Sequence, residues 1–152
     1  MNDWKADLES ALNGFVKGAG LARASIRQED IQVEYLEASH KPPSRLPKGK
    51  MAVYGFWLGS ECLKIGIAGP SSIARYTSQH YNPKSAQSTL AASLLKNTGI
   101  SERSHFNQNS AGDWIKSNCH RVNILLDTNH GMLMLRLLES FLHLYFRPRY
   151  EK

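Results

Sequence analysis

The chain has few of the residues that build an extracellular scaffold, a zinc site or a membrane anchor. Its 152 residues include two cysteines, Cys62 and Cys119, which are too few for a disulfide framework and do not share zinc-ligand spacing with the six histidines. No apolar run approaches the roughly 20 residues of a membrane span. The acidic start, MNDWKADLES, lacks the basic and apolar regions of a signal peptide. We therefore expect a cytoplasmic protein without a membrane partner.

Common nucleotide-binding and hydrolase signatures are also missing. The chain contains no P-loop, no dinucleotide-binding glycine pattern and no nucleophile elbow. Its content of 41% hydrophobic and 21% charged residues is that of an ordinary globular protein, and its length suits one compact domain.

Charge is divided unevenly along the chain. Residues 1–39 carry four Lys or Arg against seven Asp or Glu, a net charge of −3, whereas residues 40–152 carry fifteen against six, a net charge of +9. A basic body favours a polyanionic partner, with nucleic acid as the first candidate.

Breaker residues divide the chain into parts. Apolar residues near a 3.6-residue period predict an amphipathic helix over 2–17, and Ser25 can cap a second helix that runs to Leu36. The stretch HKPPSRLPKGK then forms a basic, proline-rich linker. We expect three parts: an acidic helical segment (1–39), the linker (40–50) and the main domain (51–152).

The main domain mixes strands and helices. Three runs have strand character and three have helix character, namely strands Met51–Leu58, Cys62–Ala68 and Arg121–Leu126, and helices from Ser71 or Ser72 to Tyr81, Ala86–Lys96 and Met132–Phe146. This order predicts an α+β fold with a small three-stranded, mainly antiparallel sheet flanked by helices and a helical N-terminal appendage.

The first two strands bring a tyrosine near a lysine. A three-residue loop, Gly59–Glu61, would pair Phe56 with Lys64 and place Tyr54 and Lys64 on one face, whereas a two-residue loop would place them on opposite faces. A neighbouring lysine lowers the pKa of a tyrosine and makes it a better proton acceptor. The alternative is an aromatic side chain that only packs beside an extended lysine.

Three further residues can carry chemistry. Arg75 lies early in the helix after Gly69-Pro70, where a guanidinium group suits a phosphate, and His80 is either a proton donor or a surface residue. Glu139 lies in the apolar last helix, within Leu137-Leu138-Glu139-Ser140-Phe141-Leu142. It either pairs with Arg136 at the surface or holds Mg²⁺ or Mn²⁺.

Together these residues resemble the GIY-YIG nuclease superfamily over roughly residues 51–151. The first motif looks like Ala52-Val53-Tyr54 and the second like Lys64-Ile65-Gly66, with Arg75 and Glu139 as the family arginine and glutamate. Lys64 replaces the usual tyrosine, as in one branch of restriction endonucleases of this superfamily. Two other positions depart from the pattern: Gln79 stands where a histidine is frequent, with His80 next to it, and Glu151 follows the last proline where many members have asparagine.

The resemblance implies a Mg²⁺-dependent (or Mn²⁺-dependent) endonuclease that hydrolyses phosphodiester bonds in DNA, with RNA as an alternative substrate. Tyr54, Lys64, Arg75 and Glu139 would be catalytic, Glu139 would hold the metal, and His80 is an additional candidate. Cutting both strands of a duplex with one site per chain would need a homodimer or two successive nicks. Two other readings stay open: a nucleic-acid-binding module of the same fold that does not cut, and a protein-interaction role centred on residues 1–39.

Overall fold

A four-stranded antiparallel sheet forms the centre of the protein. The computed structural model describes residues 3–97, 99–100 and 105–151. Its strands are β1 (Gln32–Leu36), β2 (Lys50–Leu58), β3 (Glu61–Ala68) and β4 (His120–Asp127), in the spatial order β1-β4-β2-β3. The predicted α+β class is confirmed, but the expectation of three strands was wrong because the chain before the linker adds β1.

Strand β1 lies where the sequence predicted a second helix from Ser25 to Leu36. Glu29 and Asp30 belong to a short 3₁₀ helix, η1 (Gln28–Asp30), and Asp30 Oδ2 accepts a hydrogen bond from Arg27 N at 2.8 Å. In the strand that follows, Val33 and Tyr35 alternate with polar residues, and this period of two fits a half-buried strand. β1 pairs with β4, with Val33 opposite Ile124.

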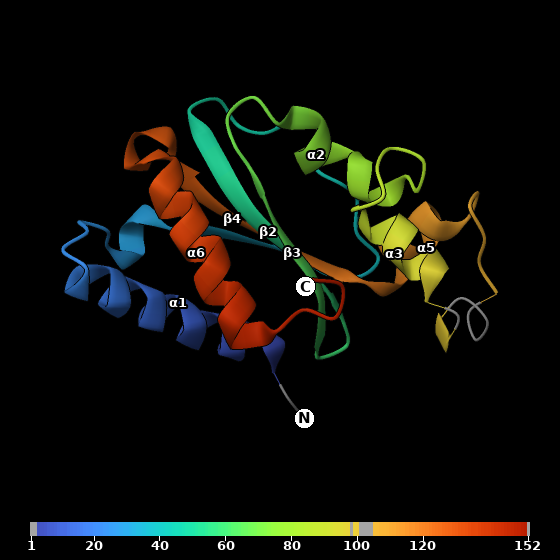
Figure 1. The fold of residues 1–152 in the computed structure, drawn as a ribbon, viewed down its shortest axis with the longest axis horizontal. Helices are drawn as coiled ribbons and strands as arrows, with labels where there is room; N and C mark the ends of the chain where they lie inside the picture. Colours follow the sequence, from blue (N-terminus) through green and yellow to red (C-terminus); the bar gives the residue numbers. More distant parts are fainter. Residues whose placement is uncertain (1–2, 98, 101–104, 152) are drawn as a thin grey trace.

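Helices cover both faces of the sheet, as Figure 1 shows. α1 (Trp4–Leu21) and α6 (Gly131–Phe146) pack on one face, and α2 (Ile73–Thr77), α3 (Leu90–Lys96) and α5 (Ala111–Asn118) pack on the other. Side chains of β2 alternate between the two cores. Val53 and Trp57 face α1 and α6, while Tyr54 and Phe56 face the other layer.

The β2–β3 hairpin has the predicted pairing but not the predicted loop. Phe56 lies opposite Lys64 and Tyr54 opposite Gly66, as expected, although the loop has two residues, Gly59 and Ser60, instead of three. The pairing shifts between Phe56, which lies opposite Lys64, and Trp57, which lies opposite Cys62, so β3 has one extra residue here that makes up for the shorter loop. The bulge therefore keeps Tyr54 and Lys64 on one face, which a two-residue loop alone would not do.

The N-terminal segment packs against the main domain. Buried residues of α1, such as Leu8 and Phe15, share one core with residues of β2, β4 and α6. Contacts thus cross the predicted boundary at residues 40–50. Whether residues 51–152 fold without the N-terminal segment stays a prediction. No helix in the described ranges is long and apolar enough to cross a bilayer.

Candidate active site

Tyr54 reaches the edge of the sheet because its neighbour on β3 has no side chain. Its phenol ring lies over Gly66, and a Cβ atom added at Gly66 would lie 2.7 Å from the Tyr54 hydroxyl oxygen. β3 is the outermost strand on this side. The glycine therefore gives the hydroxyl group a path across β3, toward residues from α2 and α6.

His80 holds the hydroxyl group of Tyr54. The Tyr54 oxygen lies 2.6 Å from His80 Nε2, and the Leu90 backbone N–H donates to His80 Nδ1 at 3.1 Å. Nδ1 accepts this bond, so the proton of a neutral imidazole is on Nε2. His80 Nε2–H therefore donates to the Tyr54 oxygen, and the hydroxyl proton of Tyr54 is left for another acceptor.

His80 is neutral because it is buried among cations. Its pKa is lowered to about 3, first by burial and then by the charges of Lys64, Arg75 and Arg121. The sequence allowed two interpretations of His80, a proton donor or a surface residue, and an exposed fraction of 2% rules out the surface residue. The reason is local: α2 ends at Thr77 and a 3₁₀ turn, η2 (Gln79–Tyr81), redirects the chain.

Tyr54 is a phenol in the free protein. Burial raises its pKa to about 12, while the guanidinium groups of Arg75 and Arg121 oppose this shift. Of these two arginines, Arg75 has the larger effect on the pKa of Tyr54. The expectation that Lys64 lowers the pKa of Tyr54 was wrong, because the net direction is upward and Lys64 has another partner.

That partner is Glu151, in the C-terminal segment. Lys64 Nζ donates to Glu151 Oε1 at 2.8 Å, and the lysine side chain is only 4% exposed. Backbone bonds to β3 hold the segment, since Arg149 N donates to Cys62 O and Tyr150 N donates to Leu63 O. Glu151 is thus a carboxylate of the site that we did not predict, although it occupies the position where the family pattern has asparagine.

Glu139 faces the same group of charges from α6. Burial raises its pKa, and the neighbouring charges that act on it are His143, Glu151, Arg75 and Lys64. Its Oε1 lies 3.7 Å from His143 Nε2, and no ion pair joins it to Arg136 within the described residues. The first of the two alternatives for Glu139, a surface pair with Arg136, is therefore not what the fold forms.

The donor set fits a divalent ion that keeps most of its water. No three His, Cys, Asp or Glu side chains come together as a metal cage in the part of the chain that the structure describes. Mg²⁺ is commonly bound by one or two carboxylates plus substrate phosphate and water. Glu139 suits such a role, because its half-buried carboxylate accepts no hydrogen bond from the described residues and lies close to the charges of Lys64 and Arg75.

A buried cation, Arg121, lies behind Tyr54. It is 0% exposed, and its Nη2 donates to Tyr76 O at 2.6 Å, its Nε to Asn123 Oδ1 at 2.8 Å and its Nη1 to the Tyr81 hydroxyl at 3.1 Å. We did not predict it. A signal was present, because Arg121 and Asn123 are polar residues at inward positions of an otherwise apolar strand.

The close approach of Tyr54 to Gly66 can be tested with Gly66→Ala. The added methyl group would collide with a rigid buried ring, so we expect a loss of about 1–3 kcal/mol in the free energy of unfolding, measured with urea. Gly18→Ala is the control, because nothing lies within 4 Å of the added Cβ and alanine favours the helix by up to about 1 kcal/mol. Unchanged stability of Gly66→Ala would contradict the described contact.

The neutral state of His80 predicts a loss of stability in acid. Its pKa in the folded protein, about 3, lies below the ordinary value of about 6.5, so the unfolded chain gains a proton that the folded protein does not. Stability should therefore fall by about 1.4 kcal/mol per pH unit below pH 6 from this group alone.

The matched variant is His80→Gln, which keeps a donor for Tyr54 but does not titrate. Urea unfolding of both proteins between pH 6 and pH 4 should give a smaller pH slope for the variant, and His40, whose pKa is also lowered, is common to both. Equal slopes would show that His80 is protonated in the folded protein.

The five side chains predicted for the site, Tyr54, Lys64, Arg75, His80 and Glu139, are thus gathered at the β3 edge. Arg75 acts on the pKa of Tyr54, His80 and Glu139, and Lys64 acts on the pKa of His80 and Glu139. Comparisons with protein-family models, with curated proteins and with solved structures found no match for this chain. The GIY-YIG nucleases therefore remain a resemblance, and the function of the chain has to be inferred from the geometry of its own residues.

Proposed function

We propose that the chain is a Mg²⁺- or Mn²⁺-dependent endonuclease that hydrolyses phosphodiester bonds in DNA. The observation that carries this proposal is the meeting of a phenol, two cations and a separate carboxylate at one sheet edge: Tyr54 from β2, Lys64 from β3, Arg75 from α2 and Glu139 from α6. Phosphoryl transfer needs such parts, a proton acceptor, positive charge for the phosphate and a ligand for a divalent ion.

Tyr54 is the residue proposed to take the proton of the attacking water. Its phenolate would be stabilised by His80 Nε2–H, which already donates to the oxygen, and by the Arg75 guanidinium, which lowers the pKa of Tyr54. His80 can act only as a donor here, because its Nδ1 is occupied by the Leu90 N–H. The two residues therefore form one proton-handling unit in which His80 orients Tyr54.

Arg75 is the residue proposed to neutralise the charge that develops on the phosphate. It is partly exposed and next to the Tyr54 hydroxyl, so a bound phosphate can reach its guanidinium. Lys64 is more deeply buried and is held by Glu151. We propose that Lys64 contributes positive charge to the site from its buried position and does not act on the attacking water.

Glu139 is the residue proposed to hold the divalent ion. When bound, such an ion would polarise the phosphate and add positive charge beside the phenol. The rise in the pKa of Glu139 comes first from burial, and a cation on the carboxylate would reverse it. A binding module that does not cut would have no use for this half-buried carboxylate.

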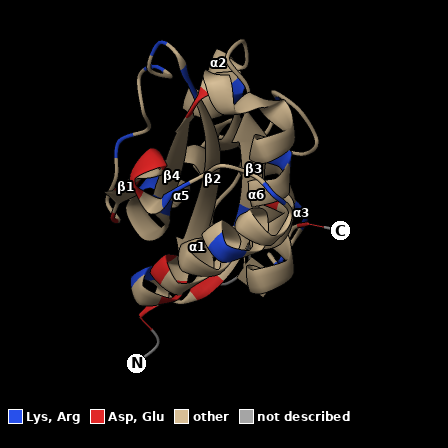
Figure 2. Ribbon diagram, turned by 90° about the vertical axis from the view of Figure 1, so that its left-hand side faces the viewer, with Lys and Arg blue, Asp and Glu red and all other residues tan. Residues whose placement is uncertain are grey.

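The charge distribution is consistent with a nucleic-acid partner. Figure 2 shows acidic segments on α1 and basic segments along the loop between β1 and β2, which borders α2. Arg45 and Lys48 of this loop and Lys50, the first residue of β2, line a cavity together with Ile73, at the start of α2. A DNA backbone could therefore contact this loop while it reaches Arg75.

The test is cleavage of plasmid DNA by Glu139→Gln in Mg²⁺ or Mn²⁺. The substitution keeps the size of the side chain and removes its charge, so we expect cleavage to fall at least about 100-fold while thermal unfolding and DNA binding in EDTA are retained. The matched control is Glu9→Gln, an exposed glutamate on α1, which should cleave like the unchanged protein.

Two results would contradict the proposal. Cleavage by Glu139→Gln at the rate of the Glu9→Gln control would remove the metal assignment. DNA binding without cleavage by the unchanged protein, in either metal, would instead favour the non-cutting module.

A further inference from the structure

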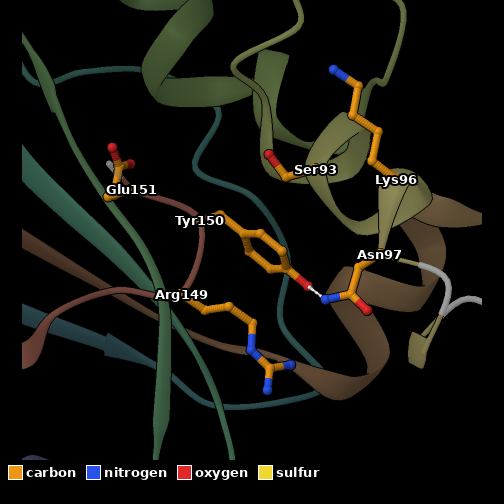
Figure 3. Close-up of a pocket in the computed structure, with 6 residues that line it drawn as sticks. All are labelled: Ser93, Lys96, Asn97, Arg149, Tyr150 and Glu151. Atoms are coloured by element: carbon orange, nitrogen blue, oxygen red, sulfur yellow. Dashed lines mark hydrogen bonds between the residues drawn. The ribbon is translucent and has the colours of Figure 1, made fainter.

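A separate pocket is lined in part by Glu151, the partner of Lys64. It is a cavity of about 360 Å³ between the C-terminal end of α3 and the C-terminal segment, and its lining residues are Ser93, Lys96, Asn97, Arg149, Tyr150 and Glu151 (Figure 3). We call it the α3 pocket. Because Glu151 lines the pocket and also bonds Lys64, the pocket adjoins the candidate active site.

The ring of Tyr150 forms a fixed surface in this pocket. Its backbone N–H is bonded to Leu63 O at 3.0 Å, and its hydroxyl oxygen accepts a hydrogen bond from Asn97 Nδ2 at 2.9 Å. The ring is thus held at both ends and lies partly buried against the core of the α2, α3 and α5 layer. A rigid aromatic ring beside a cavity is the form of site on which a nucleic-acid base stacks.

Two cations flank this ring, and both can take a phosphate. Lys96 is exposed and has no ion-pair partner among the residues described. Arg149 Nε lies 2.9 Å from Glu61 Oε1, but these side chains are 40% and 46% exposed, and exposed pairs of this kind are weak and readily exchanged. Figure 3 shows Lys96 and Arg149 on opposite sides of the Tyr150 ring.

The pocket has little negative charge left to oppose an anion. Its one acidic lining residue, Glu151, is paired with the buried Lys64. The volume, about 360 Å³, lies at the lower end of the range for small-ligand sites, about 300–1,000 Å³. One nucleotide of a strand, with an aromatic base and a phosphate on each side, matches both the size and the chemistry of this space.

We propose that the α3 pocket binds one unstacked nucleotide of the strand being cut, next to the bond that is hydrolysed. The base stacks on Tyr150, and of the two phosphates that flank the nucleotide in the strand one is held by Lys96 and the other by Arg149. This inference rests on the proposed nuclease function for its neighbouring site, but the pocket itself binds nucleic acid without metal.

The experiment measures binding of a fluorescein-labelled single-stranded DNA oligonucleotide in EDTA, over a series of salt concentrations. Lys96→Ala should reduce the slope of log K against log salt by about 0.7, the contribution of one phosphate on a single strand. Lys17→Ala, an exposed lysine on α1, is the matched control and should leave the slope unchanged.

A second pair of variants tests stacking. Tyr150→Leu should weaken binding about 5- to 150-fold, the usual effect of losing one base–aromatic stack, while Tyr150→Phe keeps the ring and should bind within about twofold of the unchanged protein. Thermal unfolding establishes that each variant is folded. If Tyr150→Leu does not fold, the salt slopes of Lys96→Ala and Lys17→Ala decide alone.

The outcomes separate this inference from the nuclease proposal. Equal slopes for Lys96→Ala and Lys17→Ala, or equal affinities for folded Tyr150→Leu and Tyr150→Phe, would overturn the pocket while leaving cleavage in Mg²⁺ unaffected. If the unchanged protein binds and the variants behave as expected but no cleavage occurs, the nuclease proposal fails and the binding pocket stands. An unchanged protein that does not bind the oligonucleotide in EDTA would overturn the pocket, and plasmid cleavage in Mg²⁺ would still decide the nuclease proposal.

Discussion

The buried guanidinium group of Arg121 is the constraint around which the candidate active site is built. A charge removed from water is costly unless its donors are satisfied and its charge is offset. Arg121 meets the first condition through hydrogen bonds to three residues, and the second through aromatic ring faces whose centroids lie 5.0–6.0 Å from its Cζ atom: those of Tyr54, Phe56, Tyr76 and Tyr81. The same charge helps to keep His80 neutral and opposes the rise in the pKa of Tyr54. The packing behind the site and the protonation states of Tyr54 and His80 therefore both depend on the side chain of Arg121.

Hydrogen bonds around Arg121 also connect residues before position 51 to the site. Asn123 accepts from Arg121 and donates to Glu34 Oε2, at 3.4 Å, so a carboxylate on β1 completes one branch. Tyr81 accepts from Arg121 and lies 2.8 Å from His40 Nε2, and the other ring nitrogen of His40 lies 2.8 Å from Cys119 O. Because a carbonyl oxygen only accepts, His40 donates there and accepts from the Tyr81 hydroxyl. Residues outside 51–152 thus satisfy polar groups behind the site.

Local patterns in the sequence predicted part of this arrangement. The register that pairs Tyr54 with Gly66 followed from counting residues across the hairpin, even though a bulge and not a longer loop provides it. The sequence could not decide the partner of Glu139, because Arg136 and His143 both lie at helical spacing from it. The path of α6 along β3 selects His143, whose Nε2 lies 3.1 Å from Ile65 O. Burial of His80 depends on where a short helix ends, and the environment of Arg121 depends on contacts with residues about 40 to 90 positions away. Such long-range effects leave no periodic signal.

The central claim is that Tyr54, held by His80 and under the influence of the Arg75 charge, accepts a proton during phosphodiester hydrolysis. The most direct measurement is the pH dependence of DNA cleavage between about pH 6 and pH 9 in saturating Mg²⁺, for the unchanged protein and for Tyr54→Phe. Because burial raises the pKa of Tyr54 to about 12, the phenolate fraction grows tenfold for each pH unit over this range. The account predicts a log rate that rises with a slope near one and a Tyr54→Phe variant that binds DNA but loses this pH-dependent cleavage. A variant that retains both the rate and the slope of the unchanged protein would contradict it.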